Sequence, residues 1–393
     1  MPRKASKILI QATLNRMLYF DHNATGPLCE SARVAWINAQ ERFHANPSSL
    51  HRPGQRAERA LEESRERLAL LLGCAANELV WTSGATEAAN AVLASLASSS
   101  SGDLLLSPVE HPCVLESANR WFRNRQRFLS CDRMGRVDVG EIERALKRGG
   151  VSAVAVMAAN NETGVLQPWE QIAFLCRERE VPLVCDATQW VGRLSSARLG
   201  QCDFVFASTH KSGGPVGSGF LKIPRSASSP RWRPFLVGGE QEDARRAGTQ
   251  NVAGAAALVA GLQDRQTRSS EASSKSRLRL DVEDSLKEGV PGIQIVAEEA
   301  DRLWNTISLL LPELRDCRRR WVVRLDAAGL ATSSGSACSS GKEAPSHVLR
   351  TMGLEAVADR IVRLSSGWDT SAAEWMHAVS IIQKVYAEET PLE

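Results

Sequence analysis

Six short apolar segments between Glu78 and Lys222 constrain the fold more than any other feature of the sequence. They alternate with longer segments that carry helix signals, as strands and helices do in βαβ units. The segments are ELVWT ending at Thr82, DLLLS at Ser107, RFLSC at Cys131, VSAVAVM at Met157, VPLVC at Cys185 and DFVFAS at Ser208. Several are apolar throughout, which is typical of strands covered on both faces. The pattern predicts an α/β fold with a mostly parallel central sheet covered by helices.

The rest of the chain divides into helical segments and a smaller α+β region. Helices are expected from Thr86, over Asp138–Arg148 and over Pro168–Glu180. Long helical material is expected over Asn251–Lys287, broken near the Ser-rich patch at 269–276. Beyond Pro291 we expect a strand near Trp321–Leu325, a Ser/Gly-rich loop over Ser333–Gly341, a strand near Arg360–Leu364 and a helix over Ser371–Ala387.

Length and composition limit the class of protein. The 393 residues exceed the roughly 250–300 at which one core stops growing, so two domains are expected. We place an N-terminal extension at 1–17, a large domain at 18–255, and a linking helix with a small domain at 256–393. A net charge of +3 with scattered basic residues argues against nucleic acid, and no apolar stretch approaches the ~20 residues of a membrane span. Nine cysteines without C-x-x-C pairs indicate reduced thiols in the cytoplasm.

Lys211 and Asp186 each follow one of these strands. Ligands of open parallel sheets bind beyond the carboxyl ends of strands, where a partly desolvated lysine can link to an aldehyde cofactor. A carboxylate at Asp186 would suit the ring nitrogen of pyridoxal phosphate (PLP), with Gln189 donating to the ring hydroxyl oxygen. Considered alone, Lys211 is more often a solvated loop lysine than a cofactor ligand. Asp186, considered alone, is equally well explained as a helix N-cap.

Two further motifs follow other strands of the same sheet. T-S-G-A-T-E from Thr82 places a glycine turn before a helix, where free N–H groups suit a phosphate, although ordinary helix capping explains it as well. It is not a nucleotide-binding fingerprint. His111 in V-E-H-P could lie over a planar cofactor and move protons near neutral pH, although a lone histidine is more often structural.

Cys338 and Arg363 lie in the C-terminal region. Cys338 stands in S-S-G-S-A-C-S-S-G, whose small polar residues argue against a core cysteine and favour a thiol that travels between an active site and a partner. Arg363 in I-V-R-L-S-S-G could bind a substrate carboxylate through two parallel hydrogen bonds, with a surface ion pair as the alternative.

Ten motifs in this order resemble the cysteine desulfurases of the class V aminotransferase family, in the branch with an S-S-G-S-A-C loop. They are Y-F-D-H-N-A-T-G-P from Tyr19, N-P-S-S-L-H from Asn46, T-S-G-A-T-E from Thr82, E-H from Glu110, A-N-N-E-T-G-V-L-Q-P from Ala159, D-A-T-Q from Asp186, S-T-H-K from Ser208, R-A-G-T-Q-N from Arg246, S-S-G-S-A-C-S-S-G from Ser333 and P-S-H-V-L-R from Pro345. The resemblance implies a PLP-transferase-like large domain with a smaller α+β domain, and bound PLP. It also implies L-cysteine as substrate, a homodimer, and a sulfur-acceptor protein such as an iron–sulfur scaffold or a thiolation enzyme.

The resemblance also implies three groups of site residues. The catalytic group is Lys211, which holds the cofactor aldehyde, His111, a stacked acid/base, and Cys338, which takes the sulfur as a persulfide while L-alanine leaves. The cofactor-binding group is Ala85, Thr86, Asn161, Asp186, Gln189, Ser208, His210 and Thr249, the last reaching the neighbouring subunit's phosphate. Arg363 and Asn161 bind the substrate.

The chain departs from the family's usual residues around this site. The family usually has Thr at Gly26, an aromatic at Gly213, Lys at Val216, Gly at Glu240 and Ser at Ala247. The segment between Asn305 and Trp321 is expected to lack a strand that the family has. These departures bear on turnover, partner docking and substrate choice. The alternatives are a selenocysteine lyase, another class V PLP enzyme such as one acting on cysteine sulfinate, and a non-catalytic sulfur-carrier scaffold.

Overall fold

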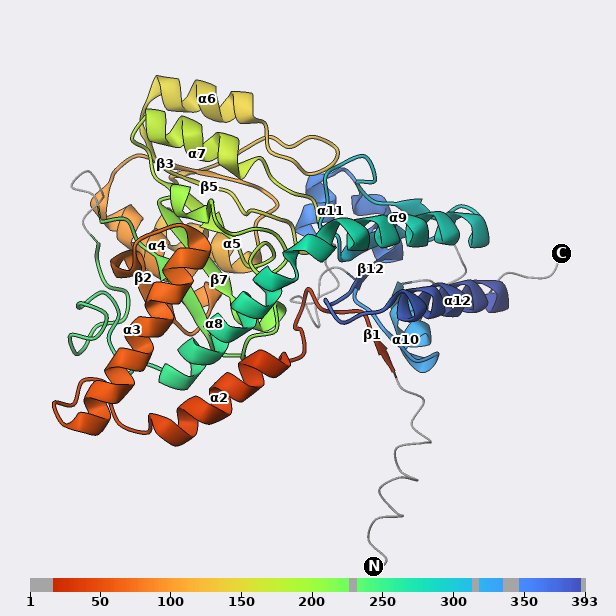
Figure 1. Ribbon diagram of the computed structural model, residues 1–393. Coiled ribbons are helices and arrows are strands. Elements are labelled where there is room, and N and C mark those ends of the chain that lie inside the picture. The colour runs from red at the N-terminus through yellow and green to blue at the C-terminus, as the bar shows by residue number, and fades with distance from the viewer. Residues whose placement is uncertain (1–16, 226–231, 313–317, 335–345, 390–393) are drawn as a thin grey trace, which may run out of the picture.

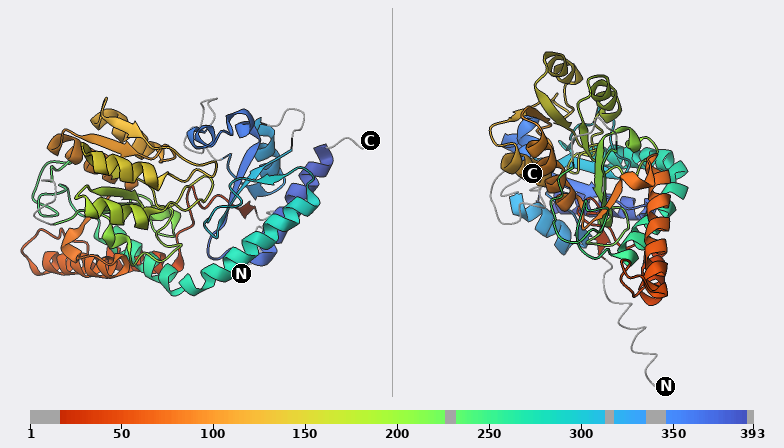
Figure 2. Two further views of the ribbon diagram at one scale, coloured as in Figure 1. Left: turned by 90° about the horizontal axis from the view of Figure 1, so that it is seen from above. Right: turned by 90° about the vertical axis from the view of Figure 1, so that its left-hand side faces the viewer.

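The computed structural model describes residues 17–225, 232–312, 318–334 and 346–389. These residues form two lobes of unequal size, and helices α8 (Val252–Thr267) and α9 (Ala272–Gly289) run along both (Figures 1 and 2). A short 3-10 turn at Ser269–Glu271 separates the two helices. The break therefore lies in the Ser-rich patch where the sequence predicts it.

The large lobe is built on a sheet with seven strands among the described residues. Its order is β2-β8-β7-β6-β5-β3-β4. The strands are β2 (Leu79–Thr82), β3 (Asp103–Leu106), β4 (Gln126–Phe128), β5 (Val151–Ala155), β6 (Leu183–Asp186), β7 (Phe204–Ser208) and β8 (Gly219–Lys222). Strand β8 is antiparallel to both of its neighbours, and the other pairs are parallel. The predicted mostly parallel sheet is confirmed, and RFLSC contributes only its first two residues to β4.

Helices cover both faces of this sheet, which explains why its strands are apolar throughout. Helices α3 (Arg52–Leu72), α6 (Val139–Arg148), α7 (Trp169–Glu178) and α8 share one buried core with the sheet. Helices α4 (Ala85–Ser99) and α5 (Pro112–Trp121) share a second core on the opposite face. Helix α2 (Glu30–Arg42) packs against α8. The parallel strands end, and helices α4 and α5 begin, at the same edge of the sheet, so the residues of the candidate site come together there.

The predicted helix limits are confirmed where the sequence has capping signals. Asp138 accepts a hydrogen bond from Gly140 N and begins α6, which Gly149 ends with a φ of 78° that favours glycine. Pro112 occupies the first turn of α5, where its missing N–H costs no hydrogen bond. These local signals set the direction in which the chain returns to the sheet after each strand.

The small lobe contains a three-stranded antiparallel sheet of order β12-β10-β9. Its strands are β9 (Gln294–Ile295), β10 (Thr306–Leu310) and β12 (Ile361–Ser365), and its helices are α9, α10 (Arg318–Ala327), α11 (His347–Thr351) and α12 (Ala372–Glu389). Strand β1 (Leu18–Tyr19) pairs with β11 (Leu330–Ala331), and both pack in this lobe's core. The predicted limit between the two domains, at residue 255, falls inside α8, which packs on the large sheet. The predicted domain limits therefore remain a proposal.

Two predictions for the small lobe are wrong. The segment Trp321–Leu325 is not a strand but part of α10, whose Trp321 and Leu325 are buried one turn apart while Val323 is 62% exposed. The segment after Asn305 does not lack a strand, since Thr306–Leu310 forms β10 in the middle of the sheet. The predicted strand near Arg360–Leu364 and the final helix are confirmed as β12 and α12.

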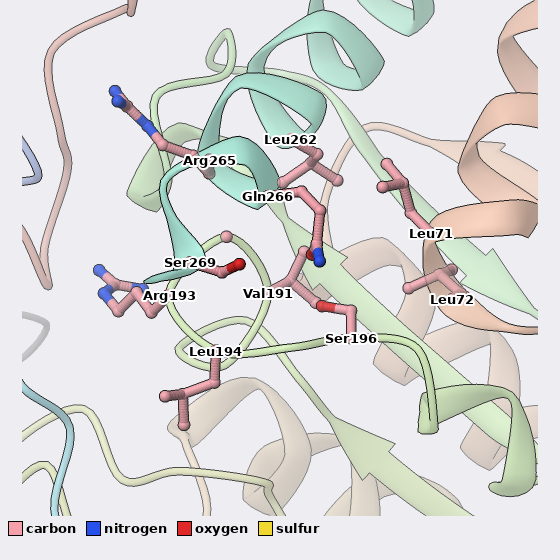
Figure 3. Close-up of a pocket in the computed structure, with 11 residues that line it drawn as sticks. Leu71, Leu72, Val191, Arg193, Leu194, Ser196, Leu262, Arg265, Gln266 and Ser269 are labelled. Carbon is pink, nitrogen blue, oxygen red and sulfur yellow. The ribbon is translucent and has the colours of Figure 1, made fainter. Parts of the chain in front are cut away.

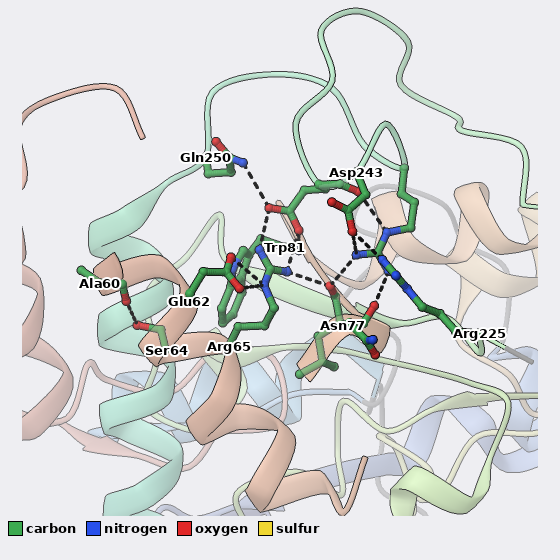
Figure 4. A network of polar contacts seen from close by, with 12 residues as sticks. Ala60, Glu62, Ser64, Arg65, Asn77, Trp81, Arg225, Asp243 and Gln250 are labelled. Carbon is green, nitrogen blue, oxygen red and sulfur yellow. Dashed lines mark hydrogen bonds and ion pairs between the residues drawn. The ribbon is translucent and has the colours of Figure 1, made fainter. Parts of the chain in front are cut away.

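A buried ion pair anchors the segment before α8 to the large lobe (Figure 4). The Arg65 guanidinium donates to Glu242 Oε2 at 2.7 Å and Oε1 at 3.0 Å, and Trp81 N and Gln250 Nε2 donate to the same carboxylate. Glu242, Asp243 and Ala244 have φ values of 53°, 54° and 59°, which non-glycine residues rarely adopt. The bidentate pair therefore holds a strained turn seven residues before Thr249.

No helix of the described residues is long and apolar enough to span a membrane.

Candidate active site

The candidate site lies at the carboxyl ends of β6 and β7, which are adjacent and parallel. Asp186 is the last residue of β6, and Ser208 ends β7 just before the 3-10 turn Thr209–Lys211. The side chain of Lys211 is partly buried there. The structure therefore places the lysine and the carboxylate, 25 residues apart in sequence, on one edge of the sheet.

Asp186 is a buried carboxyl group with one hydrogen bond from backbone. It is 6% exposed, and its Oδ1 accepts from Thr188 N at 2.9 Å. Burial raises its pKa, while the Thr188 hydrogen bonds and the charge of Lys211 lower it. A buried carboxylate next to one amine suits a protonated ring nitrogen, so this pair fits the polar ends of PLP.

The residues predicted to bind the phosphate lie in the turn before α4 and the turn after β7. Gly84 has a φ of 151°, and a Cβ there would lie 2.9 Å from Ser208 Oγ. Ala85 N donates to Ser208 Oγ at 2.7 Å, and Thr25 Oγ1 lies 3.0 Å from His210 Nδ1. Thr86 follows in the first helical turn and is exposed. The helix N-terminus and these hydroxyls meet as the sequence predicts, in an arrangement that suits an anion.

His111 forms the N-cap of α5 at the end of the loop that follows β3. Its Nδ1 accepts from Cys113 N at 3.2 Å, so a neutral ring carries its proton on Nε2. Burial, followed by the charges of Lys211 and His347, lowers the pKa of His111 to about 3. The ring is therefore neutral at neutral pH and has its Nε2–H group as a donor.

Gln189 and Asn161 are linked through Asn23. Gln189 Nε2 donates to Asn23 O at 2.9 Å, while its buried Oε1 has no partner among the described residues. That orphaned acceptor supports a bound group that supplies a donor. Asn161 O accepts from Arg363 Nη1 at 2.9 Å and from Asn23 Nδ2 at 3.1 Å, which links it to the substrate side of the site.

Arg363 is a buried arginine in β12 of the small lobe. It is 1% exposed, and besides Asn161 O it binds Asp21 Oδ1 through Nη2 at 2.5 Å. Its Nε is buried without a partner among the described residues. An unfilled donor on a fixed guanidinium is what a substrate carboxylate needs.

Thr249 and Cys338 are not brought to this edge by the described residues. Thr249 is exposed and lines a separate hollow of about 100 Å³ with Thr82, Ser83 and Arg246. Cys338 lies outside the described residues, whereas Ser333, five residues before it, is described. Ser333 pairs with the backbone of Arg363, with N···O distances of 2.7 and 3.2 Å.

Sequence reasoning gave no role to several charged residues that the structure places at the site. Asp21 binds Arg363, and Glu162 Oε2 accepts from Ser346 Oγ at 2.6 Å. Glu110 is buried, and burial followed by the charge of Asp186 raises its pKa well above the ordinary value. Each of these three residues belongs to one of the ten motifs. A charged residue in such a motif that has no assigned role is the signal by which the sequence could have identified them.

Glu162 is expected to make stability fall as the pH rises toward neutrality. Burial raises its pKa from 4.5 to about 7, although Ser346 and Arg363 both lower it. The folded state therefore keeps a proton that the unfolded chain releases, and stability present below pH 4.5 is lost as the pH rises through 7. The loss amounts to about 3 kcal/mol. Glu162→Gln keeps the acceptor for Ser346 and should remove this loss.

The measurement is the free energy of urea unfolding between pH 4.5 and 7.5. The gap between the Glu162→Gln variant and the unmodified protein should widen with pH, while the exposed Glu178→Gln control follows the unmodified protein. Parallel curves for all three proteins would show that the Glu162 carboxyl does not titrate differently on folding.

Comparison with known proteins gives one consistent result. The aminotransferase class-V family model matches residues 18–374. "Cysteine desulfurase 2" of Trichormus variabilis is 33% identical over 364 residues, covering 91% of this chain and 90% of that protein. "Cysteine desulfurase" of Nostoc sp. is 35% identical over 344 residues, covering 86% and 84%. A solved NifS-like protein superposes with a TM-score of 0.85 at 27% identity, covering 95% of this chain and all of the other. The chain belongs to the class-V aminotransferase family.

Proposed function

We propose that this protein is a cysteine desulfurase that uses PLP to convert L-cysteine to L-alanine and transfers the sulfur to its own Cys338. The observation that carries the proposal is the pairing of Ser333 with Arg363. The loop that bears Cys338 begins there, directly on the strand that holds the candidate carboxylate ligand. Five peptide units span at most about 18 Å, so the thiol stays within reach of a substrate held by Arg363.

The overall reaction balances as L-cysteine plus a Cys338 thiol giving L-alanine plus a Cys338 persulfide. PLP, when bound, supplies an electron sink that weakens the bonds of the substrate α-carbon. The Cys338 thiolate attacks the substrate sulfur, the Cβ–S bond breaks, and its electron pair stays with the three-carbon skeleton, which is protonated to alanine. The persulfide then passes to an acceptor.

The chain's own residues support this chemistry by position and charge. Asp186 would pair with the protonated ring nitrogen of bound PLP, because a buried carboxylate is best compensated by a cation. Arg363 binds the substrate carboxylate through its unpartnered Nε, and Asn161 fixes the other side of the guanidinium. Lys211 and the neutral His111 move protons near the α-carbon, a role worth about 10²–10⁴-fold.

The proposal includes a homodimer, a sulfur-acceptor protein and a cytoplasmic location. Thr249 is exposed, as a residue that reaches a neighbouring subunit has to be, and it lines a hollow with Thr82 and Ser83 of the chain's own T-S-G-A-T-E turn. The cysteines among the described residues are free rather than disulfide-bonded, which agrees with a reducing compartment. The acceptor is an iron–sulfur scaffold or a thiolation enzyme.

The test is to incubate the PLP-loaded protein with L-cysteine and a thiol reductant and to measure alanine and sulfide together. Alanine and sulfide should form in equal amounts, and D-cysteine should give neither. Alanine without matching sulfide, or no alanine from a protein that binds PLP, would contradict a desulfurase.

A further inference from the structure

A second cavity lies beside the Lys211 turn, between the two lobes. Its volume is about 300 Å³, at the lower end of the range for small-molecule sites. The small lobe contributes residues 17–20 and 366–370, and the large lobe contributes Gly26–Cys29 and Lys211–Gly213. Of the candidate active-site residues named above, only Lys211 lines it. The cavity therefore shares only Lys211 with the site that fits PLP.

Two buried arginines face this cavity. Arg193 is 4% exposed, and its acceptors among the described residues are neutral: Lys211 O at 2.9 Å, Gln189 O at 3.1 Å, and two weaker oxygens. Burial, and then the charges of Arg363 and Arg265, lower the pKa of Arg193 to about 9. Figure 3 draws a smaller hollow that shares both arginines, and shows them pointing to one side, away from Leu71 and Leu72. The cavity therefore has a positive wall without a matching carboxylate on Arg193.

Two glycines leave room for this wall. A Cβ on Gly213 would lie 2.8 Å from Arg265 Nη2, so the guanidinium occupies space that a side chain at position 213 would take. Gly26 lines the cavity, and a Cβ there would lie 3.5 Å from His22 Nδ1 and 3.7 Å from Lys211 O.

Two tryptophans also line the cavity, next to the backbone of Arg193. The rings of Trp304 and Trp368 lie 4.4 Å apart between centroids. Their indole N–H groups are already used, by Arg193 O at 3.0 Å and Gly192 O at 2.7 Å, so both rings are fixed and offer the cavity apolar surface. Asp369 and Glu374 also line the cavity. Asp369 is bound by Arg268 and lies 3.9 Å from Arg265 Nη2, and Arg265 Nη1 donates to Asp264 Oδ2 at 3.0 Å. These carboxylates disfavour a ligand with two negative charges.

We propose that this cavity binds a small monocarboxylate with a flat apolar body. The carboxylate pairs with Arg193 and Arg265, which supplies the negative charge that the buried cation lacks. The body lies against Trp304 and Trp368. The N-terminal segment does not suit the cavity, because residues 1–16 contain four basic residues and no acidic one.

The test uses the PLP-loaded protein and isothermal titration with benzoate, with neutral benzamide as the matched ligand. Benzoate should bind saturably, and benzamide should bind at least about 10-fold more weakly because it lacks the charge-assisted hydrogen bonds. Arg265→Gln should weaken benzoate binding about 10-fold, and Gly26→Leu should abolish it by filling the space. Arg363→Gln should leave benzoate binding unchanged.

Competition separates this cavity from the active site. If L-alanine displaces benzoate, or if Arg363→Gln abolishes its binding, the carboxylate occupies the substrate site and the proposal is wrong. Equal binding of benzoate and benzamide, or no binding of either, also overturns it. The cofactor absorbance and the melting temperature show whether each variant is folded; if Arg265→Gln does not fold, Gly26→Leu and the benzamide comparison decide.

Discussion

Lys211→Ala is expected to abolish covalent attachment of PLP and to reduce alanine formation from L-cysteine by about 10³-fold or more. The reason is that the amine is both the point of attachment and a proton carrier, and the structure offers no second lysine at this edge among the described residues. The fold should survive, because Lys211 is held through its backbone: Arg193 Nη2 donates to Lys211 O at 2.9 Å. The measurements are visible absorbance, alanine formation and the mass of the 211-containing peptide after borohydride treatment.

Lys211→Arg is the matched variant, since it keeps the positive charge but provides no amine for the aldehyde. It should fail as completely as Lys211→Ala while keeping the melting temperature. Lys222→Ala is not a suitable control, because Lys222 is buried and donates to Cys202 O at 2.8 Å. If Lys211→Ala keeps activity within tenfold of the unmodified protein, both the cofactor site and the proposed function are wrong.

The large lobe was predictable because local sequence patterns specify its strands. An apolar run of four or five residues followed by helix-capping signals predicts a strand covered on both faces and a helix that returns along the sheet, independently of residues far away in sequence. The small lobe was less predictable for the same reason. W-V-V-R-L has the β-branched composition of a strand, yet Trp321 and Leu325 are buried in the core, Val322 packs against it and Val323 is exposed, and that spacing belongs to a helix. Thr306–Leu310 contains the polar residues Thr306 and Ser308, which are buried in a strand that pairs with β12 along its length and with β9 at its end.

The site was predictable where its residues follow strands and unpredictable where they pair with residues far away in sequence. Asp186 and Lys211 share an edge because parallel strands end together, which sequence order alone indicates. Asp21 binds Arg363 across 342 residues of chain, and Glu162 binds Ser346 across 184. No local pattern fixes such pairs, since they join segments far apart in sequence, within the small lobe for Asp21 and between the lobes for Glu162.

Cys338→Ala should abolish sulfide release and persulfide formation, a loss of about 10³-fold or more, while PLP binding stays intact. The reason is that several of the described thiols are buried and hold their protons. Burial raises the pKa of Cys74 to about 11 and of Cys131 to about 12, and it also raises the pKa of Cys176. Such thiols carry almost no thiolate at neutral pH. Sulfide release and persulfide labelling should be measured with the cofactor absorbance recorded on the same sample.

Cys131→Ala is the matched control, because it removes a half-buried thiol without touching the 333–346 segment. It should keep full activity, and its persulfide label should remain on Cys338. Cys338→Ser tests whether a hydroxyl can replace the thiol, and it should fail because oxygen cannot carry the sulfur as a persulfide. Unchanged alanine formation in Cys338→Ala would mean that the substrate loses its sulfur without a protein acceptor. That result would replace the desulfurase mechanism with a direct lyase reaction on the same cofactor, while leaving the assignments of Lys211 and Asp186 in place.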